Sequence, residues 1–267
     1  FVAKIDTWGS WQWATMAGGS YGYDVAHSID IGPNGNAFIT GYFQYDADFG
    51  NDTIWSSGGS DVFIAKISQQ GDWIWTGVAC GTSSREAFAI AVDSQGGVFV
   101  AGEFWTGISF GNITYNTGGY RNSFIAKAID QGNSVVWDWA VKVSSSSGNS
   151  AQDIAFDSNG DLVVTGWFHG TASFGNSVMT SSGNQDVYVA KIQANSNSVW
   201  AKKAGSGSTD MGLGIAVGPQ GNLYTTGYFQ QSTISFGSVD IAGGGGFDSF
   251  IAKMSSDYDQ DTIPDSL

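Results

Sequence analysis

Cysteine and proline are nearly absent from this chain of 267 residues, which has one cysteine, Cys80, and three prolines. A single cysteine excludes an internal disulfide, and a cysteine with apolar neighbours is most often a small buried residue. The scarcity of proline excludes a proline-rich linker, while the 39 glycines predict many tight turns. No apolar run reaches the length of a transmembrane helix, so membrane insertion is not expected.

Basic residues are also few. The chain has ten Lys and Arg and 24 Asp and Glu, which gives a net charge of −14. Proteins that bind nucleic acid need clustered Lys and Arg to neutralise phosphates. Nucleic acids and anionic membrane surfaces are therefore excluded as partners. An acidic surface instead suits solubility, cation binding and salty surroundings.

The motifs of common catalytic sites are missing as well. The two histidines, His27 and His169, have no metal-ligand spacing between them, and neither a Ser-His-Asp arrangement nor a phosphate-binding glycine loop is recognisable. A glycosidase would need two carboxylates at a defined separation. The candidate acids on loops are Asp24, Glu86, Glu103 and Asp210, but three of them recur before equivalent strands, which is more typical of structural pairing.

A short phrase recurs along the chain, in the forms "FVAKID", "DVFIAKIS", "NSFIAKAI", "DVYVAKIQ" and "DSFIAKMS". Its aromatic residues are spaced by 62, 61, 64 and 62 residues and are Phe1, Phe63, Phe124, Tyr188 and Phe250. A fixed period of this length indicates a repeat architecture. Within one period, short β-branched and aromatic runs cover residues 87–94, 98–104, 123–130 and 134–143, with Gly-containing turns between them. This pattern predicts two consecutive hairpins, which form a four-stranded antiparallel meander.

Tandem four-stranded units of about 62 residues predict an all-β fold, a β-propeller in which each unit is a blade stabilised by its neighbours. The last strand of several units carries Trp-x-Trp, and we expect both indoles on one side of that strand to fill the space between blades. The repeated lysine of the phrase is interpreted as structural, with a packed stem and a paired ammonium group. The alternative is a ring of ligand-binding lysines at Lys4, Lys66, Lys127, Lys191 and Lys253.

The pattern "DxFIAKxxxxGxxxW…IAVDxxGxVxVxGxF" resembles the SBBP repeat family of bacterial and archaeal surface proteins, named for a seven-bladed β-propeller. It is carried by Asp61–Trp73 with Ile90–Phe104, by Asn122–Trp137 with Ile154–Phe168, and by Asp186–Trp200 with Ile215–Phe229. The resemblance covers residues 1–255 and implies a propeller fold and an extracellular or cell-surface setting, but no reaction. Because Phe1 falls inside a copy of the repeat, we expect further residues before it, further fused domains, and a ring larger than these blades.

Residues 256–267 depart from the repeat and form an acidic linker. Asp257, Asp259, Asp261 and Asp265 follow the spacing of ligands that turn inward around Ca²⁺. The stretch resembles the start of a thrombospondin type 3-like calcium repeat, although Thr262 replaces its usual glycine. We expect Ca²⁺ as a cofactor of this segment, with a solvated acidic linker as the alternative.

The longest predicted connections are at one end of each blade, where recognition residues usually lie. Exposed aromatic residues expected there, suited to stacking on sugars or docking a protein, are Tyr21, Tyr23, Tyr45, Trp55, Trp105 and Tyr120. Asn51 and Asn112 lie in N-glycosylation sequons, or simply in a repeated Phe-Gly-Asn turn.

These observations favour a non-catalytic extracellular propeller that acts as a binding, adhesion or structural module of a larger protein, with a protein or glycan partner at the loop end. One alternative is a polysaccharide-acting hydrolase or lyase that uses loop carboxylates. Another is an architectural subunit of a cell-surface filament or layer.

Overall fold

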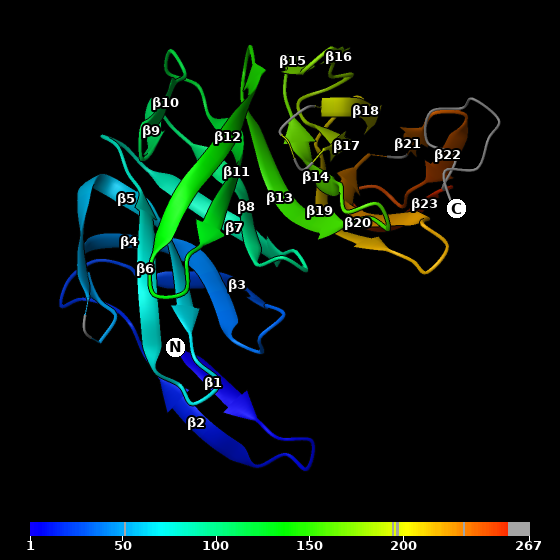
Figure 1. The fold of residues 1–267 in the computed structure, drawn as a ribbon. Helices are drawn as coiled ribbons and strands as arrows, with labels where there is room; N and C mark the ends of the chain where they lie inside the picture. The colour runs from blue at the N-terminus through cyan, green and yellow to red at the C-terminus, as the bar shows by residue number, and fades with distance from the viewer. Residues whose placement is uncertain (51, 194, 196–197, 232, 256–267) are drawn as a thin grey trace. The chain divides into compact units, whose positions relative to one another are not determined.

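The computed structural model describes residues 1–50, 52–193, 195, 198–231 and 233–255 of the chain. These residues form 23 strands and no helix, so the predicted all-β class is confirmed (Figure 1). The chain divides into two compact units. Unit 1 contains Phe1–Gly119 with Ile125–Ala140, and unit 2 contains Tyr120–Phe124 with Val141–Leu267. The acidic segment 256–267 lies outside the described residues.

Unit 1 begins with a hairpin and continues with the first blade. The hairpin joins β1 (Val2–Ile5) and β2 (Trp11–Thr15). The first blade is a four-stranded antiparallel meander of β3 (Val25–Ile31), β4 (Ala37–Asp48), β5 (Thr53–Ile67) and β6 (Trp73–Ala79). The second blade consists of β7 (Arg85–Val92), β8 (Gly97–Phe104), β11 (Asn122–Asp130) and β12 (Val135–Ser145), and β7 packs against β3, β4 and β5. Its strands lie within two residues of the predicted ones. Residues 122–124 of β11 and 141–145 of β12 are assigned to unit 2.

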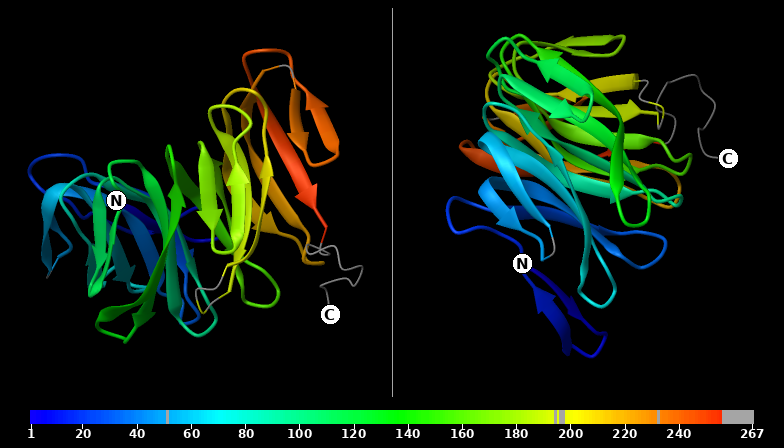
Figure 2. Two further views of the ribbon diagram at one scale, coloured as in Figure 1. Left: turned by 90° about the horizontal axis from the view of Figure 1, so that it is seen from above. Right: turned by 60° about the vertical axis from the view of Figure 1, so that its left-hand side comes forward.

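Unit 2 repeats this construction. The third blade is formed by β13 (Asn149–Phe156), β14 (Leu162–Phe168), β17 (Asp186–Ile192) and β18 (Ser198–Ala204). The fourth contains β19 (Asp210–Val217), β20 (Leu223–Gln230) and β23 (Phe247–Met254), and β19 packs against β13, β14 and β17. Figure 2 shows these twisted antiparallel sheets from two further sides. The predicted meander blades of a β-propeller are thus present in both units.

The connections between the second and third strands of the blades contain strands of their own, which the sequence did not reveal. In three blades they form the hairpins β9–β10 (Gly107–Phe110, Ile113–Asn116), β15–β16 (Thr171–Phe174, Ser177–Thr180) and β21–β22 (Thr233–Phe236, Val239–Ala242). In the first blade, β4 and β5 themselves extend into the connection. Each connection bridges back to the last strand of the preceding sheet or to a residue that follows it, through Gly18–Asp48, Cys80–Ser109, Ser144–Ser173 and Gly205–Ser235. These bridges satisfy backbone groups at sheet edges that would otherwise be unpaired.

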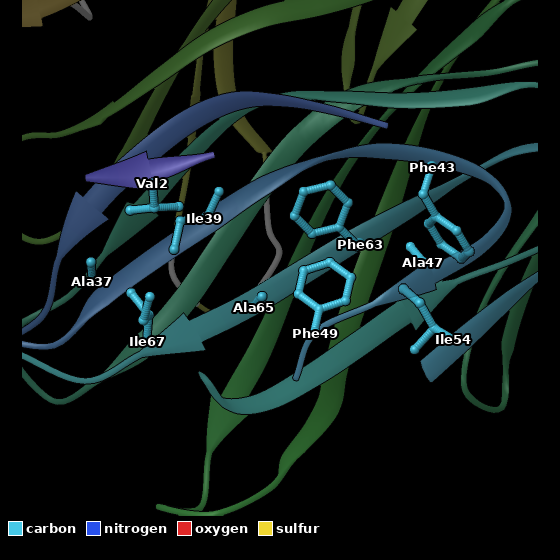
Figure 3. Packing of buried hydrophobic residues seen from close by; sticks show 10 residues of the cluster. All are labelled: Val2, Ala37, Ile39, Phe43, Ala47, Phe49, Ile54, Phe63, Ala65 and Ile67. Atoms are coloured by element: carbon cyan, nitrogen blue, oxygen red, sulfur yellow. The ribbon is translucent and has the colours of Figure 1, made fainter. Parts of the chain in front are cut away.

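In the core of unit 1, the recurring phrase alternates its side chains between the two faces of β5. Phe63 and Ala65 of β5 join a buried cluster with Ile39 and Phe43 of β4 (Figure 3). Ile64 lies between them in sequence and is buried outside this cluster. Successive strand residues point to opposite sides of the sheet, so both faces of the phrase are used for packing between blades.

The expectation that both indoles of Trp-x-Trp lie on one side of the strand is wrong. A bulge in β6 makes Trp73 oppose Ile67 and Trp75 oppose Lys66, two successive residues of β5. The extra residue shifts the alternation, so the two indoles point to opposite faces. Trp73 packs against the cluster that contains Phe49 and stacks edge-on against that ring, with ring centroids 5.0 Å apart.

Trp75 serves the other face of the sheet. Its Nε1 donates to Asp130 Oδ1 at 2.9 Å, at the end of β11 in the next blade. The two indoles of the Trp-x-Trp pair therefore make contacts on opposite faces of the sheet, rather than filling the space on one side of it.

The structural interpretation of the repeated lysines is confirmed where they are buried. Lys66 Nζ lies 2.6 Å from Asp130 Oδ2 and donates to Gly132 O. Lys191 Nζ lies 2.9 Å from Asp157 Oδ2. A buried ammonium held by carboxylates serves to join turns and strands rather than to bind a ligand.

A residue with left-handed backbone begins every insertion, two positions after the phenylalanine that ends the second strand. These residues are Tyr45 (φ 60°), Thr106 (φ 58°), Gly170 (φ 73°) and Gln231 (φ 130°). Only one of the four is glycine, the residue that adopts such angles without strain. The fold therefore imposes this conformation on ordinary residues.

Replacing Thr106 by glycine should raise the free energy of unfolding by about 1 kcal/mol, because the Cβ strain of a left-handed residue is removed. Urea denaturation measures the change. Thr114→Gly is the matched control, since Thr114 lies in the ordinary strand β10 and glycine should lower stability there. An unchanged or lower stability of Thr106→Gly would show that the left-handed conformation carries no strain.

Candidate functional site

Four of the predicted aromatic residues come together at one end of the first blade in unit 1. We call Tyr21, Tyr23, Tyr45 and Trp55 the aromatic loop surface. Their exposed fractions are 73%, 71%, 61% and 71%. Large aromatic side chains at this exposure add little to the stability of the core. A cluster of them on the surface is instead typical of a binding site.

Glycines bring the loop before β3 against the insertion. A Cβ on Gly19 would lie 2.0 Å from Asp46 O, and one on Gly22 would lie 2.9 Å from Cδ2 of Tyr45. Gly18 and Asp48 exchange backbone hydrogen bonds, both of 3.2 Å. Only glycine allows this close approach of two backbones. The sequence predicted that these two connections share one end of the blade, and the contacts confirm it.

Asp24 fixes the base of this loop. Its carboxylate accepts from the backbone N–H of Gly19 at 2.8 Å and of Gln44 at 3.3 Å. Gln44 in turn accepts from Tyr23 N at 3.2 Å through Oε1. Asp24 was one of the candidate catalytic acids, and these bonds give it a structural role.

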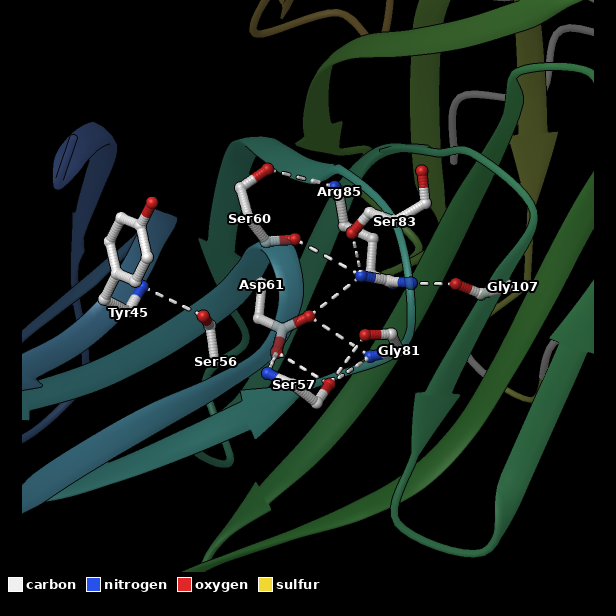
Figure 4. Close-up of polar contacts among 9 residues, drawn as sticks. All are labelled: Tyr45, Ser56, Ser57, Ser60, Asp61, Gly81, Ser83, Arg85 and Gly107. Atoms are coloured by element: carbon white, nitrogen blue, oxygen red, sulfur yellow. Dashed lines mark hydrogen bonds and ion pairs between the residues drawn. The ribbon is translucent and has the colours of Figure 1, made fainter. Parts of the chain in front are cut away.

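Tyr45 is held on the opposite side of the surface. It is the bulged residue between Gln44 and Asp46, and its backbone N–H donates to Ser56 Oγ at 2.9 Å (Figure 4). Asp46 pairs with Trp55 across β4 and β5, which fixes the strand position of the indole. The backbone under Tyr23, Tyr45 and Trp55 is thus fixed by hydrogen bonds, so that little conformational entropy remains to be lost there on binding.

Acidic and aromatic groups continue the surface toward β3 and β7. His27 lies with its ring 5.7 Å from Tyr42 and 5.3 Å from Phe88. Burial raises the pKa of the Tyr42 hydroxyl, and the negative charge of Glu86 beside it raises that pKa further. Tyr42 therefore stays neutral at physiological pH next to a carboxylate. Rings beside carboxylates are suited to cationic groups such as Lys and Arg side chains.

The other predicted site residues lie elsewhere or outside the described residues. Trp105 occupies the corresponding insertion of the second blade and is 40% exposed, while Tyr120 belongs to unit 2 and is 54% exposed. Asn112 is exposed in the tight turn between β9 and β10, as the repeated Phe-Gly-Asn turn predicts. The residues outside the described part are Asn51, Asp257, Asp259, Asp261 and Asp265.

Sequence reasoning missed a polar pair at the contacts between blades. Asp61 and Arg85 are both fully buried, and their Oδ1 and Nη1 atoms are 2.9 Å apart (Figure 4). Arg85 also donates through Nε to Gly107 O at 2.7 Å and through Nη1 to the carbonyls of Ser60 and Ser83. This guanidinium joins the first blade to the insertion of the second.

The corresponding positions in unit 2 carry different pairs. They are Asn122 with Asn149, joined by a 3.3 Å hydrogen bond, and Asp186 with Asp210. The sequence places Asp24, Glu86 and Asp210 at similar positions near the first strand of their blades. Glu86 lies one residue further along than Asp210, because Arg85 opposes Phe104 as Asp210 opposes Phe229. A repeat position that changes from Asp to Arg to Asn cannot be aligned by residue type.

Burial raises the pKa of Asp210, and the charge of Asp186 raises it further, although hydrogen bonds from Ser206 act in the opposite direction. A folded pKa above the unfolded value of 3.8 means that the protonated carboxyl stabilises the fold at low pH. This contribution is lost as the pH rises through the folded pKa, where the buried group becomes charged.

Asp210→Asn should therefore gain stability relative to the wild type as the pH increases from about 4 to 7. Urea denaturation at both pH values measures the difference between the two proteins. Asp240→Asn, the same change at an exposed position of β22, serves as the comparison. A constant difference between Asp210→Asn and wild type would contradict the assignment.

The described residues offer no group of three or more His, Cys, Asp and Glu side chains able to hold a metal ion. They also contain no helix of the length and apolarity needed to cross a membrane. Neither finding bears on the Ca²⁺ prediction, which concerns residues 257–265.

No family model matches the chain. It is 22% identical, over 98% of its length, to an uncharacterized WD repeat-containing protein L264 of Acanthamoeba polyphaga mimivirus. It is 26% identical, over 79% of its length, to the regulatory protein FlaEY of Caulobacter vibrioides. The alignments cover 24% and 23% of those proteins, so the chain spans about a quarter of the length of the curated relatives it matches. With its tandem antiparallel blades, the chain is a β-propeller-like repeat protein.

Proposed function

We propose that this chain is a non-catalytic binding module whose aromatic loop surface docks a polypeptide with basic side chains. The observation that carries the proposal is the group of four rings, each more than half exposed, three of which stand on backbone that is already hydrogen-bonded. Tyr and Trp are the residues that most often dominate binding energy at interfaces. The name of the viral relative, a WD repeat-containing protein, agrees with a repeat scaffold.

Charge favours a basic partner over a neutral one. The protein carries a net charge of −14, and Asp24, Asp46 and Glu86 lie beside the rings. Carboxylates next to aromatic faces attract Arg and Lys both by ion pairing and by cation–π contact. A long-range negative field also increases the rate at which a basic partner associates.

A glycan partner is the second candidate, because exposed Tyr and Trp rings also stack on sugars. The extracellular or cell-surface setting, membership of the SBBP family, and Ca²⁺ binding by a thrombospondin type 3-like tail belong to the same proposal. They rest on the motif resemblance and the acidic composition. In this setting the module would serve adhesion or the architecture of a larger surface protein.

Binding to an array of basic, neutral and acidic 15-residue peptides, beside a glycan array, tests the proposal. The expected result is retention of basic peptides, weakened at least about tenfold by Trp55→Ala. Trp8→Ala is the matched control, since Trp8 is 88% exposed in the turn between β1 and β2. Equal retention by Trp55→Ala and wild type would refute the role of this surface.

Two other outcomes would favour the alternatives. Retention of glycans without peptides would assign the surface to sugar recognition. Release of reducing sugar from a polysaccharide would support a hydrolase that uses loop carboxylates.

A further inference from the structure

A cavity of about 370 Å³ opens beside β23 in unit 2, away from any predicted site residue. Its walls include Ala204, Leu223, Phe236, Ala252, Lys253 and Met254. Most of this wall is apolar, and it is contributed by β17, β18, β20, β21 and β23. A cavity of this size accommodates a large aromatic side chain.

The same set of repeat positions encloses an indole in unit 1. Phe49 and Phe110, the counterparts of Phe236, each lie 5.0 Å from the ring of a tryptophan, Trp73 and Trp137 respectively. Each of these phenylalanines is followed by a glycine that borders the indole. A Cβ added to Gly50 would lie 3.5 Å from Trp73, and one added to Gly111 would lie 3.9 Å from Trp137. At Gly237, the counterpart in unit 2, a Cβ would meet nothing within 4 Å.

A hydrogen-bond acceptor for an indole is also repeated. Trp73 Nε1 donates to Met16 O at 3.4 Å, and Trp137 Nε1 donates to Val78 O at 3.1 Å. Val78 opposes Phe63, as Lys203 opposes Tyr188 in the third blade. The carbonyl of Lys203 therefore holds the position of the acceptor at this cavity.

The cavity interrupts the core of unit 2 where an indole completes the core of unit 1. One continuous cluster in unit 1 includes Ala37, Phe63 and Ile67, with Trp73 packed against it. The counterparts in unit 2 are divided between two clusters, one with Leu223 and Met254 and the other with Phe250. An indole in the cavity would contact both.

The strand beside the cavity has a free edge among the described residues. β23 pairs with β20 alone, whereas its counterparts β5 and β17 pair on both edges. Ile251 and Phe247 on β23 are 73% and 65% exposed. An edge with unpaired N–H and C=O groups can accept an added antiparallel strand.

Charge defines the occupant further. Lys127 packs 5.2 Å from the Phe99 ring, and Asp138, which follows Trp137, lies 3.9 Å from its Nζ. Lys253 packs in the same way, 5.9 Å from the Tyr224 ring, but no ion pair joins it to a carboxylate in the described part of the chain. The exposed Lys202 also lines the cavity, in a protein that is otherwise strongly acidic.

The cavity and the adjacent edge of β23 together form what we call the slot. We propose that the slot binds an extended strand of another polypeptide, which pairs with β23 and inserts a tryptophan followed by an acidic residue. The indole would pack edge-on against Phe236 and donate to Lys203 O, and the acid would face Lys253. The occupant has the chemistry of the Trp137-Asp138 strand. This site is independent of the aromatic loop surface, so failure of either proposal leaves the other intact.

Fluorescence anisotropy of a labelled peptide with the sequence of residues 134–143, SVVWDWAVKV, tests the inference. We expect saturable binding, weakened roughly 30-fold when Trp137 of the peptide is replaced by alanine. Replacing Asp138 of the peptide by asparagine should weaken binding about threefold, and only at low salt.

Protein variants locate the peptide. Ala252→Phe fills the slot and should weaken binding at least about tenfold, whereas Ala242→Phe, the same change at an exposed position of β22, should not. Absence of saturable binding, or equal binding of the Trp137→Ala peptide, would overturn the proposal, and neither result depends on the folding of a variant. A dimer of the protein that the peptide dissociates would instead assign the slot to a second copy, and would also overturn it.

Discussion

Replacing Arg85 by alanine should lower the free energy of unfolding by about 3–5 kcal/mol. The side chain is completely buried, and its removal leaves the carboxylate of Asp61 without a cation in a region that excludes water. The carbonyls of Ser60 and Gly107 lose their donor at the same time. Urea denaturation followed by tryptophan fluorescence measures this loss.

The matched control is Asp138→Ala. Its ion pair with Lys127 is 3.9 Å long, and the Asp138 side chain is 40% exposed, so the change should stay within about 1 kcal/mol. A similar loss of unfolding free energy in Arg85→Ala and Asp138→Ala would show that the Asp61–Arg85 pair is as accessible to water as the exposed Lys127–Asp138 pair.

The chain itself supplies a second test of this pair. Asn122 and Asn149 occupy the corresponding positions in unit 2, where each is buried and hydrogen-bonded without a charge. The double variant Asp61→Asn with Arg85→Asn should therefore be more stable than either single asparagine variant, because each single variant leaves one buried charge unpaired and the double variant leaves none. Additive losses in the double variant would contradict this explanation.

The second large effect is expected for Gly102→Ala, which should cost more than about 3 kcal/mol. A Cβ on Gly102 would lie 2.0 Å from Glu86 O on the neighbouring strand β7. Backbone rather than a flexible side chain lies in the way, so β7 and β8 would have to separate. The register shift between Ala87 and Ala89 occurs at this point, and the bulge brings the carbonyl close.

Gly96→Ala is the comparison for Gly102→Ala. Gly96 lies in the turn between β7 and β8 at φ 85°, with nothing within 4 Å of an added Cβ. Alanine should cost about 1 kcal/mol there, from backbone strain alone. Thermal and urea unfolding measure the loss of stability in each variant. The ratio of the two losses separates the effect of a steric clash with the neighbouring strand from the effect of a left-handed backbone conformation. Equal losses would mean that the sheet tolerates the added carbon.

The periodic features of the fold were predictable from the sequence because they repeat. A spacing of about 62 residues, alternating apolar positions and glycine turns are enough to predict the meander blades from the sequence. Gly35 at φ 73° and Gly160 at φ 79° show why glycine is needed in those turns. Exposed aromatic residues in the long connections were also predictable, and Tyr21, Tyr23, Tyr45 and Trp55 do gather on one surface.

Three features required the tertiary structure. The bulge that sends Trp73 and Trp75 to opposite faces depends on how β5 and β6 pair, and residue spacing along one strand does not contain that information. The Asp61–Arg85 pair joins two blades at positions where the residue type varies between repeats. The indole slot beside β23 consists of residues that a sequence shows only as further copies of the same pattern.

The sequence by itself thus determined the repeat, its strands and its acidic, aromatic character, since these arise from local propensity and apolar periodicity. The tertiary structure alone decided which partners the buried charges have and against which sheet face each indole packs. It also decided that a cavity lies beside β23. Those properties depend on contacts between strands of different blades, such as Arg85 with Asp61 at a separation of 24 residues and Lys66 with Asp130 at 64. Contacts of this kind form only when neighbouring sheets pack together.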